Sequence, residues 1–396
     1  MVGAGPAGAA AAVALARAGR SVHLLDKAAF PRDKCCGDGL TATALRELEA
    51  LGLDPGTLPA WEVVREVVLR SPSGREVRLA LPPAGAYAAV APRRDLDHAL
   101  VGLAREAGAE VSDGRAVREV EVDSGGVTLR LDGDAVVTAA YVVAADGAWS
   151  PVRKALGASE EGYRGDWYAF RQYWSGTSAA ARAMWVWFEP DLLPGYAWSF
   201  PLPGDRVNLG YGIARGSGHA VGDMAEQWRE LLTRPHIAGV LGPGAEPEGP
   251  HRAWPIPARV WRSSLSAGGG RVLFAGDAAR ATDPLTGEGI AQALATGRLA
   301  AAAVLGADGA DPATVAAAYR RSVARELFAD HRLAKLLGRG LSHRKGARTA
   351  IRAAGLSEGT RRQFARWLFE DYPRALVLTP RRWRRGAVST PGAYSS

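Results

Sequence analysis

Gly3-Ala4-Gly5-Pro6-Ala7-Gly8, almost at the start of the chain, is the stretch that decides the fold. A helix is predicted from this glycine turn to about Ala18, Gly19 is typical of a helix stop, and residues 21–26 have the pattern of an apolar strand. Together they indicate a βαβ unit. Only Met1-Val2 precedes the turn, whereas a first strand needs about five residues. We therefore expect part of this strand to be missing upstream, through a mis-assigned start or a trimmed chain.

The rest of the chain alternates between strand-like and helical patterns. We predict, in order, a helix at 41–51, alternating strands at 63–81, a helix at 93–108, two or three strands within 117–143, aromatic-rich strands at 163–214, a buried strand at 272–275, a helix at 287–305 and helices from 312 to about 369. This order favours an α/β fold, in which a Rossmann-like dinucleotide-binding domain carries an inserted antiparallel β domain and a basic helical C-terminal section. The expected boundaries are 1–60, 90–155 and 265–310 for the first domain, 61–89 and 156–264 for the second, and 311–396 for the third section.

Composition excludes several classes of protein. With 396 residues, 47% of them hydrophobic, the chain can bury the cores of about two or three domains. It contains no run of about 18 apolar residues and no signal-peptide pattern. Cys35 and Cys36 are the only cysteines; being adjacent, they cannot close an ordinary disulfide loop, and they are too few for a cysteine metal site. We expect no metal and a cytoplasmic location.

Positive charge is concentrated at the C-terminal end. Residues 311–396 hold 18 Lys and Arg against 6 Asp and Glu, whereas the rest of the chain is slightly acidic and the whole chain carries +8. A solvated helical surface is one interpretation; another is an anionic membrane surface, with the protein peripheral on the inner face of the membrane. Nucleic acid is disfavoured because no zinc-finger spacing or RNA-binding signature is present.

The glycine turn is suited to binding a dinucleotide. Its glycines permit a tight turn and let a phosphate approach backbone N–H groups, and the following helix presents its positive N-terminus. Asp26, 18 positions after Gly8 and at the end of the second strand, is placed to accept hydrogen bonds from a ribose. This spacing alone does not separate FAD from NAD, and a turn without a ligand is the alternative.

Two further segments resemble motifs of class A flavoprotein monooxygenases. Residues 145–153, which begin Ala-Asp-Gly, resemble the Asp-Gly motif, and Gly276-Asp277-Ala278-Ala279 with Pro284 and the Gly287-Glu288-Gly289 run resembles the Gly-Asp motif. The resemblance implies FAD as the cofactor and a fold of the class A monooxygenase and glutathione-reductase type. It places Asp277 on the ribityl chain, and the helix that begins near Gly287 would direct its positive end at the flavin. Arg93, in an Arg-x-x-Leu-Asp pattern, would contact the FAD.

A longer match links the chain to the geranylgeranyl reductase family. Residues 30–41, Phe-Pro-Arg-Asp-Lys-Cys-Cys-Gly-Asp-Gly-Leu-Thr, closely resemble that family's signature, although Cys35 replaces its usual proline. Residues 195–201 resemble its Tyr-x-Trp-x-Phe-Pro motif, and the resemblance spans roughly residues 1–310. It implies that Tyr196 and Trp198 line a tunnel for a polyprenyl tail and that Cys36 lies near the flavin. Tyr196, Trp198 and Phe200 alternate along one strand and so share a face, and Trp185 and Trp187 are expected to extend this aromatic wall.

The resemblance thus implies a complete set of site residues. The expected catalytic residues are Cys36, Tyr196 and Trp198, and no metal ligand is expected. The expected cofactor-binding residues are Gly3, Gly5, Ala7, Gly8, Asp26, Lys27, Arg32, Cys36, Gly37, Arg93, Asp146, Gly147, Gly276, Asp277, Pro284, Gly287, Gly289 and Ile290.

The function that the resemblance implies is reduction of carbon–carbon double bonds in a prenyl chain by hydride transfer from reduced FAD. Candidate substrates are the menaquinone side chain, geranylgeranyl diphosphate and derived lipids, and the electron donor is NAD(P)H, a ferredoxin or another reductase. Two alternatives stay open. One is an FAD monooxygenase or halogenase that acts on an aromatic molecule. Arg280 counts against this alternative, because many hydroxylases have histidine at this position. The other is a flavin- or isoprenoid-binding protein without turnover.

Overall fold

The first part of the fold is a mostly parallel sheet with Val2 at its centre. The structure, a computed structural model, describes residues 1–218, 220–306, 309–383 and 390–395. Val2 forms parallel bridges with Leu25 on one side and with Ala144 on the other. The order across the sheet is β7 (Glu110–Ser112), β1 (His23–Leu25), Val2, β11 (Val142–Ala144), β19 (Val272–Phe274) and β18 (Ser266–Ala267). The glycine turn therefore leaves the middle of the sheet, which confirms the predicted βαβ unit.

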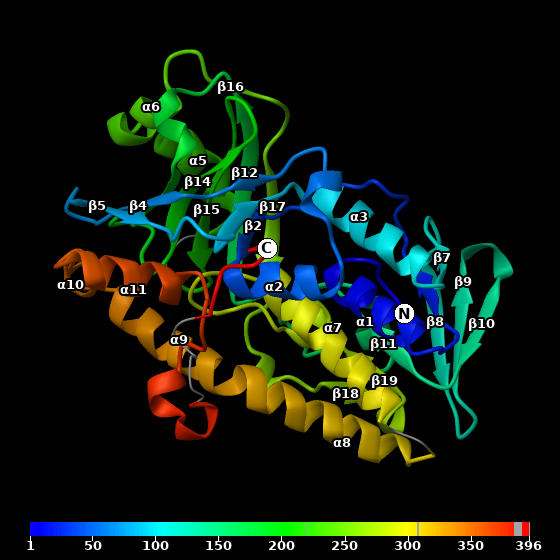
Figure 1. The fold of residues 1–396 in the computed structure, drawn as a ribbon. Helices are drawn as coiled ribbons and strands as arrows, with labels where there is room; N and C mark the ends of the chain where they lie inside the picture. Colours follow the sequence, from blue (N-terminus) through cyan, green and yellow to red (C-terminus); the bar gives the residue numbers. More distant parts are fainter. Residues whose placement is uncertain (219, 307–308, 384–389, 396) are drawn as a thin grey trace.

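Two small-residue helices cross this sheet side by side. α1 (Pro6–Arg17) begins at the glycine turn, and α7 (Ile290–Leu305) runs along it in Figure 1. They approach so closely that a Cβ added at Gly297 would lie 2.1 Å from the carbonyl oxygen of Ala7. Both helices begin at the edge of the sheet where the parallel strands end, so their positive N-termini face the same region. The neighbouring helices are α2 (Ala42–Ala50), α3 (Arg93–Glu106), α4 (Pro151–Ala155) and α8 (Pro312–Val323).

The second part is a large, mostly antiparallel sheet. Its strands, in order, are β16 (Glu246–Pro247), β12 (Trp167–Ser175), β15 (Arg206–Ala214), β14 (Tyr196–Leu202), β13 (Met184–Trp187), β4 (Glu66–Arg70) and β5 (Glu76–Ala80), and β17 (Arg252–Ile256) also pairs with β12. Helices α5 (Met224–Thr233) and α6 (Pro235–Leu241) cover one face, where the rings of Phe170, Tyr211 and Trp228 pack together. The other face is turned toward the first sheet. A small sheet, β2 (Gly39–Thr41), β6 (Ala88–Val90) and β3 (Glu62–Val63), lies between the two.

The strand register corrects one expectation about the aromatic wall. Val186 pairs with Trp198 across β13 and β14, and directly paired residues of antiparallel strands point to the same face. Trp185 and Trp187 therefore point to the opposite face, where their rings stack with centroids 5.7 Å apart inside the core beneath α5 and α6. The prediction that they extend the wall of Tyr196 and Trp198 is wrong.

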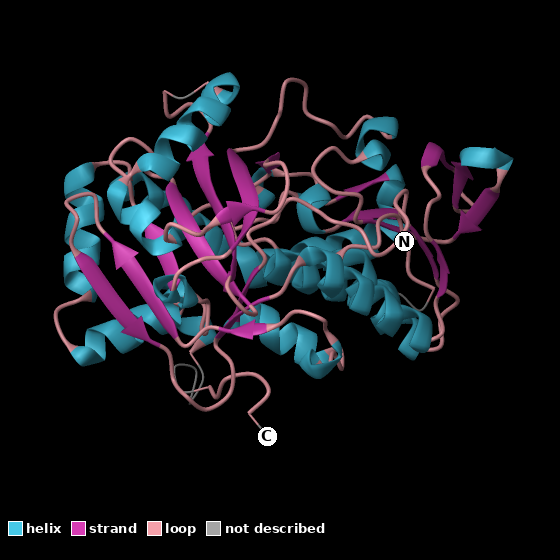
Figure 2. Cartoon of the chain, turned by 90° about the horizontal axis from the view of Figure 1, so that it is seen from above, coloured by secondary structure: helices cyan, strands magenta, loops and turns pink. Residues whose placement is uncertain are grey.

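The region 117–143 holds four strands rather than two or three. β8 (Val117–Val122), β9 (Val127–Leu131) and β10 (Val136–Ala139) form an antiparallel meander, and the fourth strand is β11 of the central sheet. The break between β9 and β10 is a short turn at which Gly133 has φ 71°. Figure 2, seen from above, shows the meander at the end of the molecule remote from the large sheet.

The C-terminal section is helical, as predicted. α8 continues through a π-helical turn, Ala324–Phe328, into α9 (Ala329–Leu341), which is followed by α10 (Arg344–Ala354) and α11 (Glu358–Leu368). α11 packs against β5, so these helices close one side of the large sheet (Figure 1). Within the described residues, no helix combines the length and apolar character needed to cross a bilayer.

The close contact of α1 with α7 predicts opposite effects for two glycine-to-alanine substitutions. Gly297→Ala forces the helices apart, because the new methyl group meets the Ala7 carbonyl, and we expect a loss of about 1–3 kcal/mol in the free energy of unfolding. Gly338→Ala in α9 meets nothing within 4 Å and should gain up to about 1 kcal/mol from helix propensity. Urea denaturation followed by circular dichroism measures both. Equal stabilities of the two variants would show that α1 and α7 are not in tight contact.

Candidate active site

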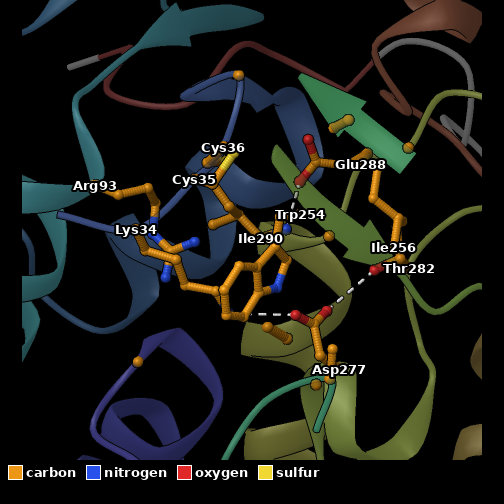
Figure 3. A pocket seen from close by; sticks show the side chains of 18 of the residues that line it. Lys34, Cys35, Cys36, Arg93, Trp254, Ile256, Asp277, Thr282, Glu288 and Ile290 are labelled. Carbon is orange, nitrogen blue, oxygen red and sulfur yellow. Dashed lines mark hydrogen bonds and ion pairs between the residues drawn. The ribbon is translucent and has the colours of Figure 1, made fainter. Parts of the chain in front are cut away.

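A large cavity lies where the two parts of the fold meet. Its volume is about 1070 Å³, and its walls come from the glycine turn, the Cys35-Cys36 loop, the segment that leads into α7 and the inner face of the large sheet. Figure 3 shows Lys34, Cys36 and Arg93 on one side of this pocket and Asp277 and Glu288 on others. Segments that are far apart in the sequence therefore contribute to one site.

The structure brings almost all of the expected site residues to this cavity. The three expected catalytic residues line it, and so do the expected cofactor-binding residues except Gly8 and Pro284. Pro284 is buried within the loop that precedes α7. Gly8 faces the backbone, because a Cβ there would lie 1.8 Å from the Gly3 carbonyl oxygen. Gly8 thus allows the helix to pack on the turn rather than lining the cavity.

The glycine turn forms a cradle that fits the phosphates of a dinucleotide. Gly3 has φ 95° and its Cβ would lie 2.3 Å from the Ala145 carbonyl oxygen, so only glycine fits there. Gly5, the N-cap of α1, makes no side-chain cap, and the nearest atoms to its missing Cβ are the guanidinium nitrogens of Arg32 and Arg93, beyond 3.5 Å. The N-terminus of α1 is therefore open toward the cavity, with cationic side chains beside it. An anionic pyrophosphate satisfies such a helix end.

Carboxylates are held in place around this cradle. Asp26 accepts hydrogen bonds from the backbone N–H groups of Ala4 at 2.7 Å and Ala28 at 2.9 Å, which fixes it at the end of β1. An ionised carboxylate has further lone pairs for a ribose. Asp277 is likewise fixed, by Lys34 and by the Thr282 hydroxyl, each at 3.2 Å (Figure 3). Both carboxylates line the cavity and are oriented before any ligand binds.

Arg93 reaches the cavity as part of a buried charge cluster. Its guanidinium donates two hydrogen bonds of 2.7 Å to Asp97, one turn further along α3, and Arg32 forms an ion pair of 2.8 Å with the same carboxylate. Two arginines thus share one aspartate, which leaves net positive charge near the N-terminus of α1. This excess favours an anionic ligand.

The loop of Cys36 is tied to the large sheet by Asp38. Asp38 is buried with φ 62°, and its carboxylate accepts from the Tyr173 hydroxyl at 2.6 Å and from the Asn208 amide at 2.8 Å. The same amide donates to the Cys36 carbonyl at 2.8 Å, and its oxygen accepts from the Trp198 indole at 3.1 Å. Burial raises the pKa of Asp38 to about 6, although these hydrogen bonds oppose the rise. The network fixes the loop against the aromatic wall.

Both cysteines are free thiols in this loop. Burial raises the pKa of Cys36 to about 11 and that of Cys35 to about 12, so neither is a thiolate at neutral pH. The Cys35 thiol donates to the Arg252 carbonyl at 3.4 Å, and the Cys36 sulfur accepts from the Asp38 N–H at 3.3 Å. Both are therefore uncharged groups in this loop at neutral pH.

The inner face of the large sheet makes an apolar compartment next to this loop. Tyr196, Trp198 and Phe200 form a continuous row with ring centroids about 6 Å apart, a spacing in the range of favourable aromatic contacts. Gly210 makes room for the Trp198 indole, because a Cβ there would lie 2.4 Å from the ring. The remaining apolar lining comes from other strands and from the C-terminal helices: Leu69, Trp167, Met184, Val186, Phe188, Trp254, Ile256, Leu341, Phe364, Trp367 and Leu368.

The N-terminus of α7 is not free to bind a ligand through all of its N–H groups, as the expected geometry required. The carboxylate of Glu288 accepts from the N–H groups of Ile290 at 2.8 Å and Ala291 at 2.9 Å, so a side chain already occupies the first N–H groups of α7. Burial raises the pKa of Glu288 to about 7 despite these hydrogen bonds. The positive end of α7 is therefore directed at Glu288 as well as at the cavity.

A buried ion network fastens this loop to the C-terminal section. Arg374 forms ion pairs with Asp283 at 2.5 Å and Glu370 at 3.2 Å, and its side chain is only 2% exposed. Asp283 in turn accepts from the N–H groups of Leu285 and Thr286, at 2.9 and 2.8 Å. The loop that carries Glu288 is thus held rigidly from the far end of the chain.

Sequence reasoning missed several residues of this site. The sequence shows Glu288 only as part of a glycine motif, and it indicates no role for Asn208 or Arg374. Phe364 and Trp367 line the cavity from a section to which nothing specific was assigned. The only signal for them was an aromatic pair with helical spacing on an otherwise basic helix.

Comparison with known proteins identifies relatives of the whole architecture. The model of the FAD binding domain family matches residues 1–296. A menaquinone reductase of Mycolicibacterium smegmatis is 36% identical over 76% of this chain and 74% of its own length, and digeranylgeranylglycerophospholipid reductase 1 of Methanopyrus kandleri is 36% identical over 76% and 78%. A geranylgeranyl bacteriochlorophyll reductase-like crystal structure from Thermoplasma acidophilum shares the fold, with a TM-score of 0.80, 21% identity and coverage of 95% of this chain and 96% of that chain.

Removal of Arg374 should destabilise the protein in a pH-dependent way. Arg374→Ala leaves buried Asp283 without its cation, and we expect a loss of about 3–5 kcal/mol at neutral pH. Arg374 holds the pKa of Asp283 below its ordinary value against the effect of burial. The stability from this pair is therefore present above about pH 4 and disappears as the pH falls, so the deficit of the variant should shrink in acid. Exposed Arg381→Ala is the control, expected within about 0.5 kcal/mol of wild type in urea titrations. A pH-independent deficit would contradict this account.

Proposed function

The chain belongs to the FAD binding domain family, and within it to the geranylgeranyl reductase group; from this premise we propose that it reduces carbon–carbon double bonds of a polyprenyl chain. The relatives named as menaquinone reductases favour the side chain of menaquinone as the substrate. The cofactor is FAD. FAD, once reduced, would supply the hydride, and the proposed electron donor that reduces it again is NAD(P)H, a ferredoxin or another reductase.

The observation that carries the proposal is the continuity of the cavity. One cavity is lined by the dinucleotide cradle at the N-terminus of α1, by the aromatic row of β14, and by apolar side chains at the end of α9 and in α11. Among the described residues, the lining contributed by α9 and α11 contains no charged side chain. A long apolar chain gains free energy by entering such a space, whereas a diphosphate would lose its hydration there.

The proposed FAD ligands follow from the geometry of the cradle. Gly3, Gly5 and Ala7 would let the pyrophosphate reach backbone N–H groups, Asp26 would bind the adenosine ribose, and Asp277 would bind the ribityl chain. The remaining proposed FAD-contacting residues are Lys27, Arg32, Cys36, Gly37, Arg93, Asp146, Gly147, Gly276, Gly287, Gly289 and Ile290. The proposed domains are the FAD domain at 1–60, 90–155 and 265–310, the substrate domain at 61–89 and 156–264, and the C-terminal section at 311–396.

Tyr196, Trp198 and Cys36 are proposed to position the alkene. The Tyr196 hydroxyl donates to the Thr286 carbonyl and the Trp198 indole donates to Asn208, so the polar edges of both rings are satisfied within the protein. Their ring faces are left as apolar surface for the substrate. Cys36, as a neutral thiol opposite them, narrows the cavity without adding charge. The three side chains exclude water and hold the double bond in one place, which is how an unactivated alkene can be brought to react.

The C-terminal section is proposed to dock on an anionic bilayer. Leu341, at the end of α9, lines the cavity, and four exposed basic side chains lie around the turn to α10: Arg339, Arg344, Lys345 and Arg348. Leu336, 60% exposed, lies on the same stretch of α9. A basic surface with exposed apolar side chains is complementary to anionic phospholipids, from which a prenyl lipid could enter the cavity.

Anaerobic single turnover tests the proposed reaction. Protein with bound FAD is reduced with dithionite and mixed with menaquinone, while flavin absorbance and the mass of the lipid are followed. We expect reoxidation of the flavin and, after air has returned the quinone ring to its oxidised form, a lasting mass gain of two hydrogens in the prenyl side chain. Asp277→Ala, from which FAD should dissociate, is the control for dependence on flavin. Reoxidation only in the presence of oxygen, with oxygenation or halogenation of an aromatic compound, would replace the proposal with the monooxygenase or halogenase reading.

Charge reversal tests the membrane surface. The triple variant Arg344→Glu, Lys345→Glu, Arg348→Glu should bind vesicles of anionic phosphatidylglycerol at least about a hundredfold more weakly, given about 1 kcal/mol for each basic residue at the surface. A matched triple reversal of exposed residues on other parts of the protein, Arg105→Glu, Arg130→Glu and Lys154→Glu, should bind as wild type does. Co-sedimentation at low and high salt measures both. Equal losses in the two triples would show that net charge alone, and not this face, attracts the vesicle.

A further inference from the structure

Glu288 is a cavity-lining carboxyl group to which the proposed reaction has so far given no role. It stands between Gly287 and Gly289 in the segment that leads into α7, and its side chain lines the same cavity as Cys36 and Tyr196 (Figure 3). Its charge raises the pKa of both of those groups, which places the carboxyl close to the compartment assigned to the alkene.

The two oxygens of this carboxyl group have different environments. Oε1 accepts hydrogen bonds from the N–H groups of Ile290 and Ala291, whereas Oε2 makes no hydrogen bond with any of the described residues. The backbone carbonyl of Glu288 accepts from the Asp283 N–H at 2.8 Å, which holds the residue in its loop. A carboxyl group fixed through one oxygen, with the other left available in a cavity, has the arrangement of a positioned acid.

Burial and the charges around Glu288 bring its pKa close to neutral pH. Burial is the largest effect and raises its pKa, Asp283 adds to the rise, and the two backbone N–H groups and Arg374 oppose it, with a result of about 7. Cys36, Tyr196 and Glu370 are the other titratable groups that interact with it. Efficient general acids have a pKa near the working pH. The Cys36 thiol, with a pKa of about 11, and the Tyr196 hydroxyl, raised by burial, are much weaker acids.

We infer that Glu288 is the acid that completes the reduction, an inference that rests on the proposed function. The π bond of the alkene breaks, one carbon takes the hydride from the reduced flavin, and the other takes the proton from the carboxyl group of Glu288. The flavin is left oxidised and Glu288 is left as a carboxylate. The electron donor would then return two electrons to the flavin, and Glu288 would regain a proton from water.

The same geometry couples the proton on Glu288 to the charge of the flavin. Reduction adds negative charge to the cavity, and a like charge nearby favours the neutral form of a carboxyl group. Glu288 therefore binds its proton more tightly when the flavin is reduced. Reduction of the flavin would therefore be accompanied by protonation of Glu288, so that the acid carries its proton when the alkene binds.

Redox titration of the bound flavin tests this coupling without any substrate. Above about pH 7, the slope of the midpoint potential against pH should be steeper in the wild type than in Glu288→Gln. The difference should correspond to the uptake of one additional proton for each pair of electrons. The amide oxygen of glutamine can still accept from Ile290 and Ala291, so the loop should keep its structure. Glu106→Gln, at an exposed position of α3, is the matched control and should follow the wild type. Identical slopes in wild type and Glu288→Gln would overturn the inference.

Single-turnover reduction of the menaquinone side chain, followed by the mass of the lipid, supplies the second measurement. Glu288→Gln should reduce the side chain about 10²–10⁴-fold more slowly, with unchanged flavin content and unchanged affinity for menaquinone, and Glu288→Asp should recover part of the rate. Wild-type rates should fall as the pH rises through the pKa of Glu288, and this break should be absent in Glu288→Gln. If wild type and Glu288→Gln reduce the menaquinone side chain at equal rates, the role of Glu288 is overturned and the proposed function is not. A wild type that reduces no prenyl alkene would overturn the proposed function and this inference with it.

Discussion

The approach of α1 to α7 is the constraint on which the rest of the structure depends. Gly297 lies so close to the Ala7 carbonyl that no side chain fits between the helices, and Gly8 lies equally close to Gly3. These contacts fix the two helix N-termini at one edge of the parallel sheet, the first open to a phosphate and the second covered by Glu288. Everything that the proposed chemistry needs is arranged relative to this edge: the cradle for FAD on one side and the aromatic compartment on the other.

The large sheet is joined to this edge by polar contacts in an otherwise apolar setting. Asp38, Asn208 and Trp198 form a buried hydrogen-bonded chain that holds the Cys36 loop against β14. Because buried polar groups are costly when unpaired, such a chain favours one position of the loop over all others. The apolar face of the sheet can then be placed accurately beside the cofactor site, although hydrophobic contacts by themselves are not directional.

The C-terminal section contributes to the site in two ways. Arg374 binds Asp283 and Glu370 and so stabilises the loop that carries Glu288, while Phe364 and Trp367 extend the apolar compartment. The same section bears the excess positive charge of the chain on its outer surface. A lipid surface, an apolar cavity and an acid near the flavin would thus be connected through one set of helices.

The sequence by itself determined the α/β class, the βαβ opening, the family and FAD, because glycine turns and helix starts are local and leave a fixed spacing. Most of the candidate site residues could be placed for the same reason. It did not determine which face of β13 meets the cavity: alternation tells which residues share a face, and only the pairing of Val186 with Trp198 decides which face it is. The sequence also could not pair Asp283 with Arg374, because residues 91 positions apart are brought together only by the fold. The protonation of Glu288 was decided by tertiary structure alone, because burial and neighbouring charges, not residue type, set the pKa of a carboxyl group.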